Sequence, residues 1–556
     1  MSTSCAESFA ESACIDDLTL TPIVLQQSLL TPIISHMLTS MELTCNEDWD
    51  CYDADSVKKQ LPNLFPRVGC ISNRFFDSTL LSVKVFLETK TFSVDDEDLP
   101  ELISFASFFG AELKSIFLEV KSSHIEYLPN YSNVITGLRL KSNCLHDFDF
   151  LRSLSLHYLP NLRSLDCNHN NLNNESVMAL AKGLKINSSV IELVLSGNTL
   201  GVEGIDYLSK VLITNSTISK IVLSFTSIGV TGALNLARFL KLNSTISELD
   251  LGENSIGDEG ANAIAEVLKH NCTIAKIDLG GNSITDEGAI ALAAVLRVNF
   301  KISKIDLNSN SITDSGAIAL AEAITRNSTV TELNLSYNSI GITGAVALAN
   351  ALRVNTTITD IVLSYNSIGV LGAIAVAEAL KINNTITRVD LSSNSIGTRG
   401  ALALAEAFKI NTTVTEINLW RNEIGDEGAK ALAEAFKINS SITTVDLSSN
   451  SIGNEGALAL AESLKVNTTI SGIILSSNSI GGSGIITLAD MLKINSTVTE
   501  MNLMFNSVSG SDAMALSEVL KINSTITKMN IIGSRVSIDS ETKICVKAIS
   551  KGRILC

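Results

Sequence analysis

Residues 246 to 273 read ISELDLGENSIGDEGANAIAEVLKHNCT, and this stretch decides the fold. In its first part Leu249 and Leu251 alternate with polar or small residues, which predicts a strand with one buried face. After Gly257, apolar residues recur at helical spacing from Ala261 to Leu268, which predicts an amphipathic helix. The stretch is therefore a strand and a helix joined by a polar turn.

The same pattern recurs every 28 residues. The asparagine of its turn, in the context Leu-x-Leu-x-x-Asn-x-Ile, stands at positions 170, 198, 254, 282, 310, 338, 366, 394, 422, 450, 478 and 506, while Thr226 and Ser534 keep the register. Weaker units run from 116 to 125 and from 137 to 145. One unit cannot bury its apolar face alone, so neighbouring units must stack into a continuous core. The repeat predicts an α/β solenoid, curved and open, with a parallel sheet inside and helices outside.

This pattern resembles the leucine-rich repeat. The 28-residue length and the alanine-rich helix are similar to the ribonuclease-inhibitor type, which is also found in the sensor ends of NOD-like receptors, and the resemblance implies a curved horseshoe. It covers at least residues 162 to 530. We expect a small, mainly helical N-terminal region without repeats at 1–110, irregular first repeats at 111–161, and regular repeats with a C-terminal cap at 162–556.

Two recurrent asparagines need an explanation. The asparagine after each strand is expected to hydrogen-bond backbone groups in the turn, which neither sheet nor helix satisfies. A second asparagine follows each helix in an Asn-x-Ser/Thr triplet, for example Asn271. Its strict period indicates that it ends the helix and is not a glycosylation acceptor.

Composition excludes several function classes. The net charge is −17, which disfavours duplex nucleic acid as a partner because that affinity comes from Lys and Arg, and favours a basic protein. No run reaches the roughly 18 apolar residues that a membrane helix needs. The first 17 residues contain no Lys or Arg, so no secretory or transit peptide is expected and the predicted compartment is the cytoplasm.

No catalytic or cofactor motif stands out. The chain lacks a Gly-x4-Gly-Lys-Ser/Thr phosphate loop, a His-Glu-x-x-His motif and a Gly-x-Ser-x-Gly elbow. We therefore expect no catalytic, cofactor-binding or metal-binding residues. One class of catalytic protein uses such a scaffold without a pocket: the GTPase-activating proteins for Ran resemble these arcs. Activation of GTP hydrolysis by Ran is therefore kept as an alternative function.

Candidate binding residues lie between the strand leucines, where side chains face the inside of the arc. One column carries an Asp ladder, which predicts a negative surface that attracts a basic partner; its members are Asp250, Asp278, Asp306, Asp390 and Asp446. The adjoining columns are mostly Ser and Gly but contain Tyr337, Tyr365, Trp420 with Arg421, and Met504 with Phe505, of which the first four are the proposed contacts. Trp, Tyr and Arg dominate binding hot spots. The simpler alternatives are a solvated sheet face and a Trp420 that only shields neighbouring strands.

Residues 1 to 110 differ in composition from the repeats. After an acidic stretch, Leu99, Leu102 and Phe109 predict one amphipathic helix. Together with Val85, Phe86 and Leu87 this region weakly resembles the late helices of BTB domains, which implies dimerisation or a cullin-type partner; an F-box-like module and a helical cap are the alternatives. The leading hypothesis is a non-enzymatic scaffold that binds a partner protein on the inner face. The runner-up is a ubiquitin-ligase substrate adaptor that recruits the ligase through residues 1–110.

Overall fold

The structure is a computed structural model that describes residues 44–45, 91–95, 115–120, 135–140, 160–533 and 554–555. The chain forms two compact units, Met1–Asn170 with Ile186–Val194, and Asn171–Lys185 with Leu195–Cys556. The helix predicted around Leu102 and the basic C-terminal cap, with Lys543 and Lys547, lie outside the described residues.

The first unit contains the early strands. β1 (Thr44–Cys45) pairs antiparallel with β2 (Thr91–Asp95). From β2 onward the strands pair in parallel, in the order β3 (Ser115–Val120), β4 (Ile135–Leu140), β5 (Ser164–Asp166) and β6 (Glu192–Val194). β3 and β4 fall on the two weaker units at 116–125 and 137–145. The sequence did not predict the strand at Thr91–Asp95.

The second unit is a regular solenoid. Its strands are β7 (Lys220–Val222), β8 (Glu248–Asp250), β9 (Lys276–Asp278), β10 (Lys304–Asp306), β11 (Glu332–Asn334), β12 (Asp360–Val362), β13 (Arg388–Asp390), β14 (Glu416–Asn418), β15 (Thr444–Asp446), β16 (Gly472–Ile474), β17 (Glu500–Asn502), β18 (Lys528–Asn530) and β19 (Ile554–Leu555). The repeat helices are α7 (Asn174–Ile186), α8 (Gly201–Leu212), α9 (Gly229–Leu240), α10 (Gly257–Leu268), α11 (Asp286–Leu296), α12 (Asp314–Ile324), α13 (Ile342–Leu352), α14 (Gly369–Leu380), α15 (Gly397–Phe408), α16 (Gly425–Phe436), α17 (Asn454–Leu464), α18 (Gly482–Leu492) and α19 (Gly510–Val519).

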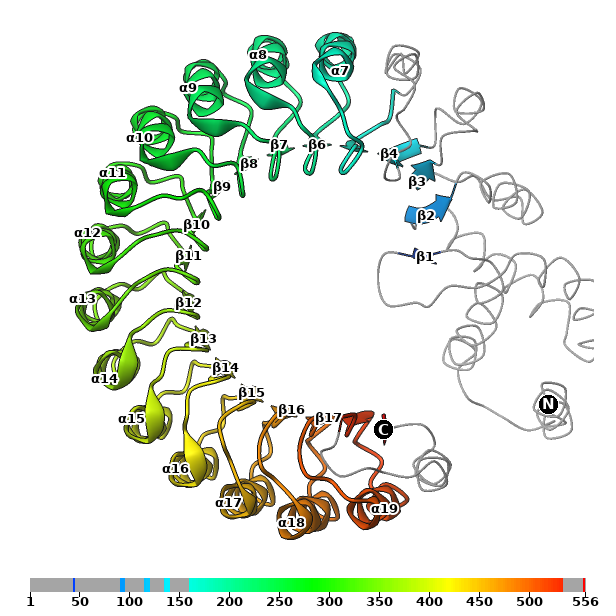
Figure 1. The fold of residues 1–556 in the computed structure, drawn as a ribbon, viewed down its shortest axis with the longest axis vertical. Helices are drawn as coiled ribbons and strands as arrows, with labels where there is room; N and C mark the ends of the chain where they lie inside the picture. Colours follow the sequence, from blue (N-terminus) through cyan, green and yellow to red (C-terminus); the bar gives the residue numbers. More distant parts are fainter. Residues whose placement is uncertain are drawn as a thin grey trace, which may run out of the picture. The chain divides into compact units, whose positions relative to one another are not determined.

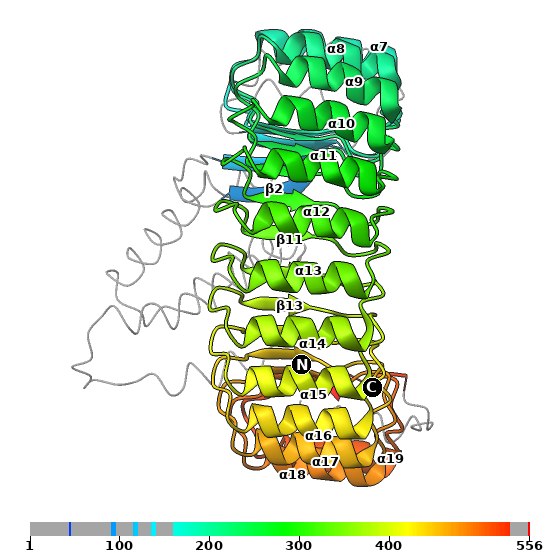
Figure 2. The same ribbon diagram turned by 90° about the vertical axis from the view of Figure 1, so that its left-hand side faces the viewer.

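Within this unit the strands line the inside of an arc and the helices line the outside (Figure 1). From β7 to β18 each strand residue pairs with the residue 28 positions later, for example Lys304 with Glu332, whereas Met529 in β18 pairs with Ile554 in β19. The helices lie across the arc, side by side (Figure 2). Because a helix is wider than a strand, stacking both in one repeat bends the sheet inward. The predicted α/β solenoid with a parallel inner sheet is confirmed.

The core lies between the two layers. In the repeat quoted above, Leu249, Leu251 and Ile256 from the strand and turn are buried together with Ile264 and Leu268 from α10. The helices also approach one another closely, because small residues line their contacts.

Gly316 illustrates the closeness of adjacent repeats: a Cβ there would lie 2.7 Å from Oδ1 of Asp286 and 3.0 Å from Cβ of Ala289. Adjacent repeats are therefore locked together at each helix start.

The turn asparagines join adjacent repeats, as their predicted backbone role requires. Nδ2 of Asn282 donates to the carbonyl oxygens of Leu251 and Gly280, at 2.9 and 3.0 Å. Thr226 takes the same place in its repeat, and its hydroxyl donates to the carbonyl of Leu223 at 2.6 Å. The strand there keeps its register. Ser534 lies outside the described residues.

The second asparagine ends the helix of the preceding repeat. Nδ2 of Asn355 donates to the carbonyl of Ile324, at the end of α12, at 2.8 Å, and its Oδ1 accepts from the backbone N–H of Thr357 at 2.9 Å. Asn355 is only 4% exposed. The buried amide nitrogen is already occupied by backbone carbonyls, which agrees with the structural role predicted for the triplet.

Candidate protein-binding surface

Three rows of side chains cover the inner face of the second unit. The entry row holds the first residue of each strand, such as Glu248, and the exit row holds the third, such as Asp250. The turn row holds the residue just before each turn asparagine, such as Tyr337. Because the repeats have no insertions, members of one row are stacked at the spacing of neighbouring strands.

The entry row is charged but internally balanced. Nζ of Lys276 lies 2.7 Å from a carboxylate oxygen of Glu248, and Nζ of Lys304 lies 2.6 Å from one of Glu332. Further along, Arg388 lies 4.0 Å from Asp360 and 3.8 Å from Glu416. These exposed pairs contribute little to stability, but they cancel most of the charge of the row.

The exit row carries the Asp ladder, and the structure gives it a second role. Each carboxylate accepts a hydrogen bond from the backbone N–H two residues later, as Asp278 does from Gly280 at 2.8 Å. The same bond is made by Asp250, Asp306, Asp390 and Asp446. Asparagines in the row make it too, as Asn334 does with Ser336. Sequence analysis missed this reason for the recurrence of Asp and Asn.

The ladder is not uniformly open to solvent. Asp306 and Asp390 are each 8% exposed, so they are poorer contact candidates than the sequence suggested. Asp250, Asp278 and Asp446 are half-buried. Burial, together with the nearby Asp306 and Asp250 carboxylates, raises the pKa of Asp278 to about 6. Burial also raises the pKa of Asp250 and of Asp446 above the ordinary value.

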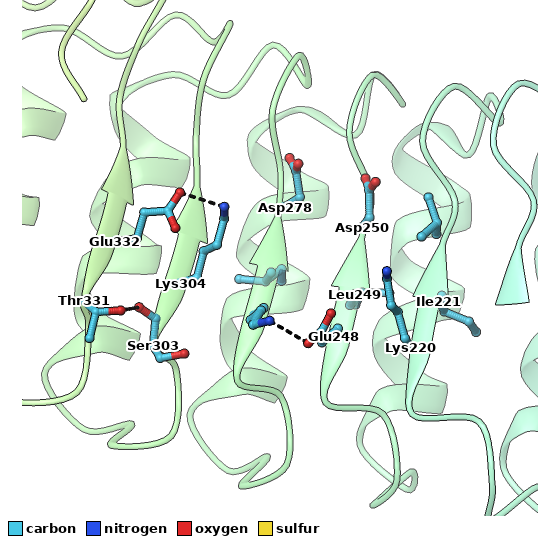
Figure 3. Close-up of a pocket in the computed structure, with 13 residues that line it drawn as sticks. Lys220, Ile221, Glu248, Leu249, Asp250, Asp278, Ser303, Lys304, Thr331 and Glu332 are labelled. Atoms are coloured by element: carbon cyan, nitrogen blue, oxygen red, sulfur yellow. Dashed lines mark hydrogen bonds and ion pairs between the residues drawn. The ribbon is translucent and has the colours of Figure 1, made fainter. Parts of the chain in front are cut away.

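A groove of about 500 Å³ follows the entry and exit rows from β7 to β11 (Figure 3). Figure 3 shows Asp250 and Asp278 side by side at its edge, with Lys304 turned toward Glu332. Its lining carries Lys220, Glu248 and Lys276 as well. The groove is shallow and is lined about equally by polar and apolar surface, which suits an extended protein segment better than a small apolar ligand.

The turn row has an unusual backbone. Its residues adopt the left-handed conformation, for which Gly is the easiest choice and a bulky side chain is an outlier. Gly197, Gly281 and Gly533 occupy it in three repeats, with φ of 64° to 70°. Yet Tyr337 and Tyr365 occupy it with φ of 52°. Strained positions of this kind cluster at functional sites.

The structure brings three predicted contact residues together. The rings of Tyr337 and Tyr365 are stacked, with centroids 3.9 Å apart and planes 16° apart. The Tyr365 ring also meets Trp420, with centroids 5.5 Å apart and planes at 57°. We call Tyr337, Tyr365 and Trp420 the aromatic cluster. It spans four repeats and sits beside the groove, since Tyr337 and Glu332 belong to the same repeat.

Small residues make room for the aromatic cluster. The repeat between Tyr365 and Trp420 presents Ser392 and Ser393, and the buried Oγ of Ser393 has no hydrogen-bond partner. Nε1 of Trp420 donates to Oγ of Ser449 at 3.1 Å, which fixes the indole. Tyr337 is 50% exposed. Hydrogen bonding to Tyr365, partial burial and the charge of Asp390 raise the pKa of Tyr337 to about 12.

Arg421 lies in the turn row, exposed, with φ of 53°. Its backbone N–H donates to the carbonyl of Ser448 at 2.9 Å, so the backbone is fixed while the side chain faces solvent. Sequence analysis missed Phe225, which lies in the same row with φ of 56° and is 60% exposed. Phe225 has the same position in its repeat as Tyr337, and this match in the sequence could have identified it.

Comparison with known proteins gives these repeats a family. The family model described as Leucine Rich repeat matches nine segments, residues 158–181, 242–265, 270–293, 298–321, 326–349, 354–377, 383–405, 411–433 and 439–461. These nine segments are leucine-rich repeats. No catalytic family is indicated by the matches.

Among solved structures, 205 chains match this chain. One is titled Leiomodin-1 Actin-Binding Site 2 (ABS2); it is 24% identical, and the alignment covers 28% of this chain and 88% of that chain with a TM-score of 0.24. So low a TM-score carries no argument about this chain. A search of curated proteins finds no match.

Among the residues that the structure describes, no group of three or more His, Cys, Asp or Glu side chains is arranged to hold a metal ion. None of the helices within that part of the chain is long and apolar enough to cross a membrane.

Proposed function

We propose that this leucine-rich repeat chain is a non-enzymatic scaffold that binds a partner protein on the inner face of its second unit. The aromatic cluster is the observation that carries the proposal. Tyr337, Tyr365 and Trp420 come from separate repeats and meet on the open face. Two of them occupy strained backbone positions that Gly or Ser fills in most repeats of the second unit. Since the whole turn row shares this backbone, the aromatic side chains are what distinguish these repeats, and Tyr and Trp side chains are typical of binding hot spots.

The charge of the inner face favours a basic partner. The entry row is balanced by its own ion pairs, so the uncompensated charge comes from exit-row carboxylates such as Asp250 and Asp446. A basic segment of a partner would lower that repulsion, and its Lys or Arg side chains could stack on the aromatic cluster through cation–π contacts. We therefore infer an extended basic segment that follows the groove toward Trp420, with Arg421 contacting the partner from the next position.

The test uses affinity purification from cytosolic extract with the full chain, comparing wild type with a Tyr365→Ala, Trp420→Ala double variant and identifying proteins by mass spectrometry. We expect a basic protein that is recovered with wild type and at least tenfold less with the double variant. Phe505→Ala is the matched control, because Phe505 is an exposed turn-row aromatic that lies outside the cluster. Equal recovery by wild type and by the folded double variant would overturn the assignment of the site.

Four finer hypotheses rest on the sequence. The 28-residue length favours the ribonuclease-inhibitor type of repeat, and a cytoplasmic location stays a prediction. The ubiquitin-ligase adaptor hypothesis concerns residues 1–110, which lie mostly outside the described part. It predicts that a cullin-type subunit is recovered in the same purification and is kept by the double variant. Ran-type GTPase activation predicts faster GTP hydrolysis when the chain is added.

A further inference from the structure

A second surface lies on the flank of the solenoid, away from the inner face. The residue just before each helix-ending asparagine forms what we call the flank row. From position 354 to 522 this residue is Val or Ile in seven consecutive repeats, and each side chain is 57% to 69% exposed: Val354, Ile382, Ile410, Ile438, Val466, Ile494 and Ile522. In the preceding repeats Thr214, His270 and Arg326 occupy the row in alternation with Leu242 and Val298. Exposed apolar residues also occur earlier in the row, at Ile186, Leu242 and Val298, but the uninterrupted apolar stretch lies in one half of the arc.

The row is held rigidly. Each residue follows the end of a helix, and its backbone N–H donates to a helical carbonyl, as Ile382 does to Ala379 at 3.1 Å. The next residue is a buried asparagine, such as Asn383, which is anchored to the carbonyl of Leu352 at 2.8 Å. Val and Ile have stiff side chains. Burial of this row would cost little conformational entropy, which is a property of good contact surfaces.

From Ile382 onward the charges beside the row are balanced, whereas Val354 follows Arg353, with Asn350 three residues earlier. A Lys precedes each member of the flank row from Ile382 to Ile522. Each of these Lys residues is paired with a carboxylate three residues earlier, as Lys437 is with Glu434 at 2.6 Å. An anionic membrane or a strongly charged protein would gain little from such a neutral strip. A chain whose net charge is −17 repels its own copies elsewhere, but not along this strip.

The geometry points to a second copy of this chain as the occupant. Since the helices lie across the arc (Figure 2), the residues after their C-terminal ends share one flank and follow its curvature. A two-fold axis that passes through the middle of the row, in the plane of the arc, lays the row onto itself in the reverse direction. Ile438 is the middle member, so it would meet the partner's Ile438, and Ile382 would meet the partner's Ile494. Only a surface with the same spacing and curvature matches all seven positions.

The area is adequate for such a contact. At roughly 100 Å² for each exposed aliphatic side chain, the seven together offer roughly 700 Å², close to the ~800 Å² per partner that a standard interface buries. We propose that the chain forms a two-fold dimer through the flank row. This proposal is independent of the inner-face function, because the two surfaces share no residue.

The first test is the mass of the full chain in solution, by light scattering after size exclusion and by sedimentation at several concentrations. Wild type is expected to dimerise. Ile410→Arg, Ile438→Arg and Val466→Arg combined should weaken the dimer at least tenfold. Arg326 shows that the row accepts arginine without disturbing the repeat. The matched control places three arginines at Ile290, Leu402 and Leu458, which are exposed on the outer helix faces, and it should still dimerise.

The second test checks the register by oxidative cross-linking. Ile438→Cys should give a cross-linked homodimer above the wild-type background, whereas Ile382→Cys alone should not. A mixture of Ile382→Cys and Ile494→Cys chains should cross-link. A wild type that stays monomeric, a dimer unaffected by the three row arginines, or a dimer that never cross-links through Ile438 would each overturn the proposal. So would row-dependent binding of a monomer to vesicles of phosphatidylcholine and phosphatidylserine, which would assign the row to a membrane.

Discussion

The side-chain oxygen of Asn282 accepts a hydrogen bond from the backbone N–H of Asn254, one repeat earlier, at 3.0 Å. The same oxygen accepts from the backbone N–H of Ile256 at 3.3 Å, while Nδ2 donates back to the carbonyl of Leu251. One side chain thus satisfies backbone groups in two repeats. Stability along the solenoid is therefore transmitted from repeat to repeat through single polar residues as well as through the core.

Asn282→Ala is expected to destabilise the second unit by about 2–4 kcal/mol, because Asn282 is fully buried and several backbone groups would lose their partners. Urea unfolding followed by circular dichroism measures the change. Asn282→Thr is the matched control, since Thr226 occupies this register naturally and keeps a bond to a strand carbonyl. A threonine variant as unstable as the alanine variant would contradict this explanation.

Asp286→Ala is expected to cost about 1–2 kcal/mol at pH 7, because the Asp286 carboxylate caps the helix of the next repeat. It accepts from the backbone N–H groups of Thr313 and Gly316 at 2.8 and 2.9 Å. Partial burial pushes the pKa of Asp286 up, but the bonds from the Thr313 hydroxyl and from these two N–H groups outweigh it, so the pKa is lowered.

The lowered pKa makes this effect depend on pH. The stabilisation is fully present above the pKa of the unfolded chain and is lost as the pH falls through the folded pKa, so wild type and Asp286→Ala should converge in acid. Asp286→Asn should keep most of the stability at pH 7, as Asn454 caps Gly481 in the same register at 2.9 Å. Urea midpoints at pH 7 and pH 3 decide the matter; an unchanged difference at pH 3 would be inconsistent with the carboxylate as the cap.

Asp278→Asn is expected to stabilise the protein at pH 8 and to have little effect near pH 4. Burial and the adjacent Asp306 and Asp250 carboxylates raise the pKa of Asp278 to about 6, whereas the unfolded chain has a carboxyl pKa of about 3.9. A raised pKa means that ionisation costs folding free energy from about pH 4 through pH 6, and the cost is constant above. We expect a gain of about 1–2 kcal/mol at pH 8, allowing for solvent screening. Thermal or urea unfolding at both pH values checks this, and a gain of equal size at pH 4 would refute it.

Tyr365→Ala is expected to shift the fluorescence of Trp420 to longer wavelength and to make it more easily quenched by acrylamide, because the Tyr365 ring shields the indole. The chain has only two Trp, so a Trp49→Phe background isolates the signal of Trp420. Phe505→Ala in the same background should leave the spectrum unchanged. An unshifted emission in Tyr365→Ala would show that the two rings are not in contact in solution.

The position of each site residue in its repeat could be predicted from the sequence, but the contacts between residues of different repeats could not. The rows of a gap-free repeat are visible in the sequence, so Tyr337, Tyr365 and Trp420 could be placed on one face. The contact between these rings could not be predicted, because it depends on how far the Tyr365 side chain extends over Ser392 and Ser393. The hydrogen bond that each exit-row aspartate accepts from its own turn was also not predicted, since one carboxylate can bind the backbone and still line the groove. For the same reason the sequence could not reveal that Asp306 and Asp390 are buried.

The sequence by itself determined the α/β solenoid, because every 28-residue unit carries an apolar face that only an identical neighbour can bury. It also determined the role of both asparagine rows, since polar residues at fixed places in a turn must satisfy the same backbone groups each time. The tertiary structure alone decided which side chains of different repeats touch, as in the aromatic cluster. It alone exposed the flank row, because helical periodicity ends just before Ile438 and no longer predicts which way that side chain points. There the backbone carbonyls at the helix end bind the asparagine and leave the isoleucine in solvent.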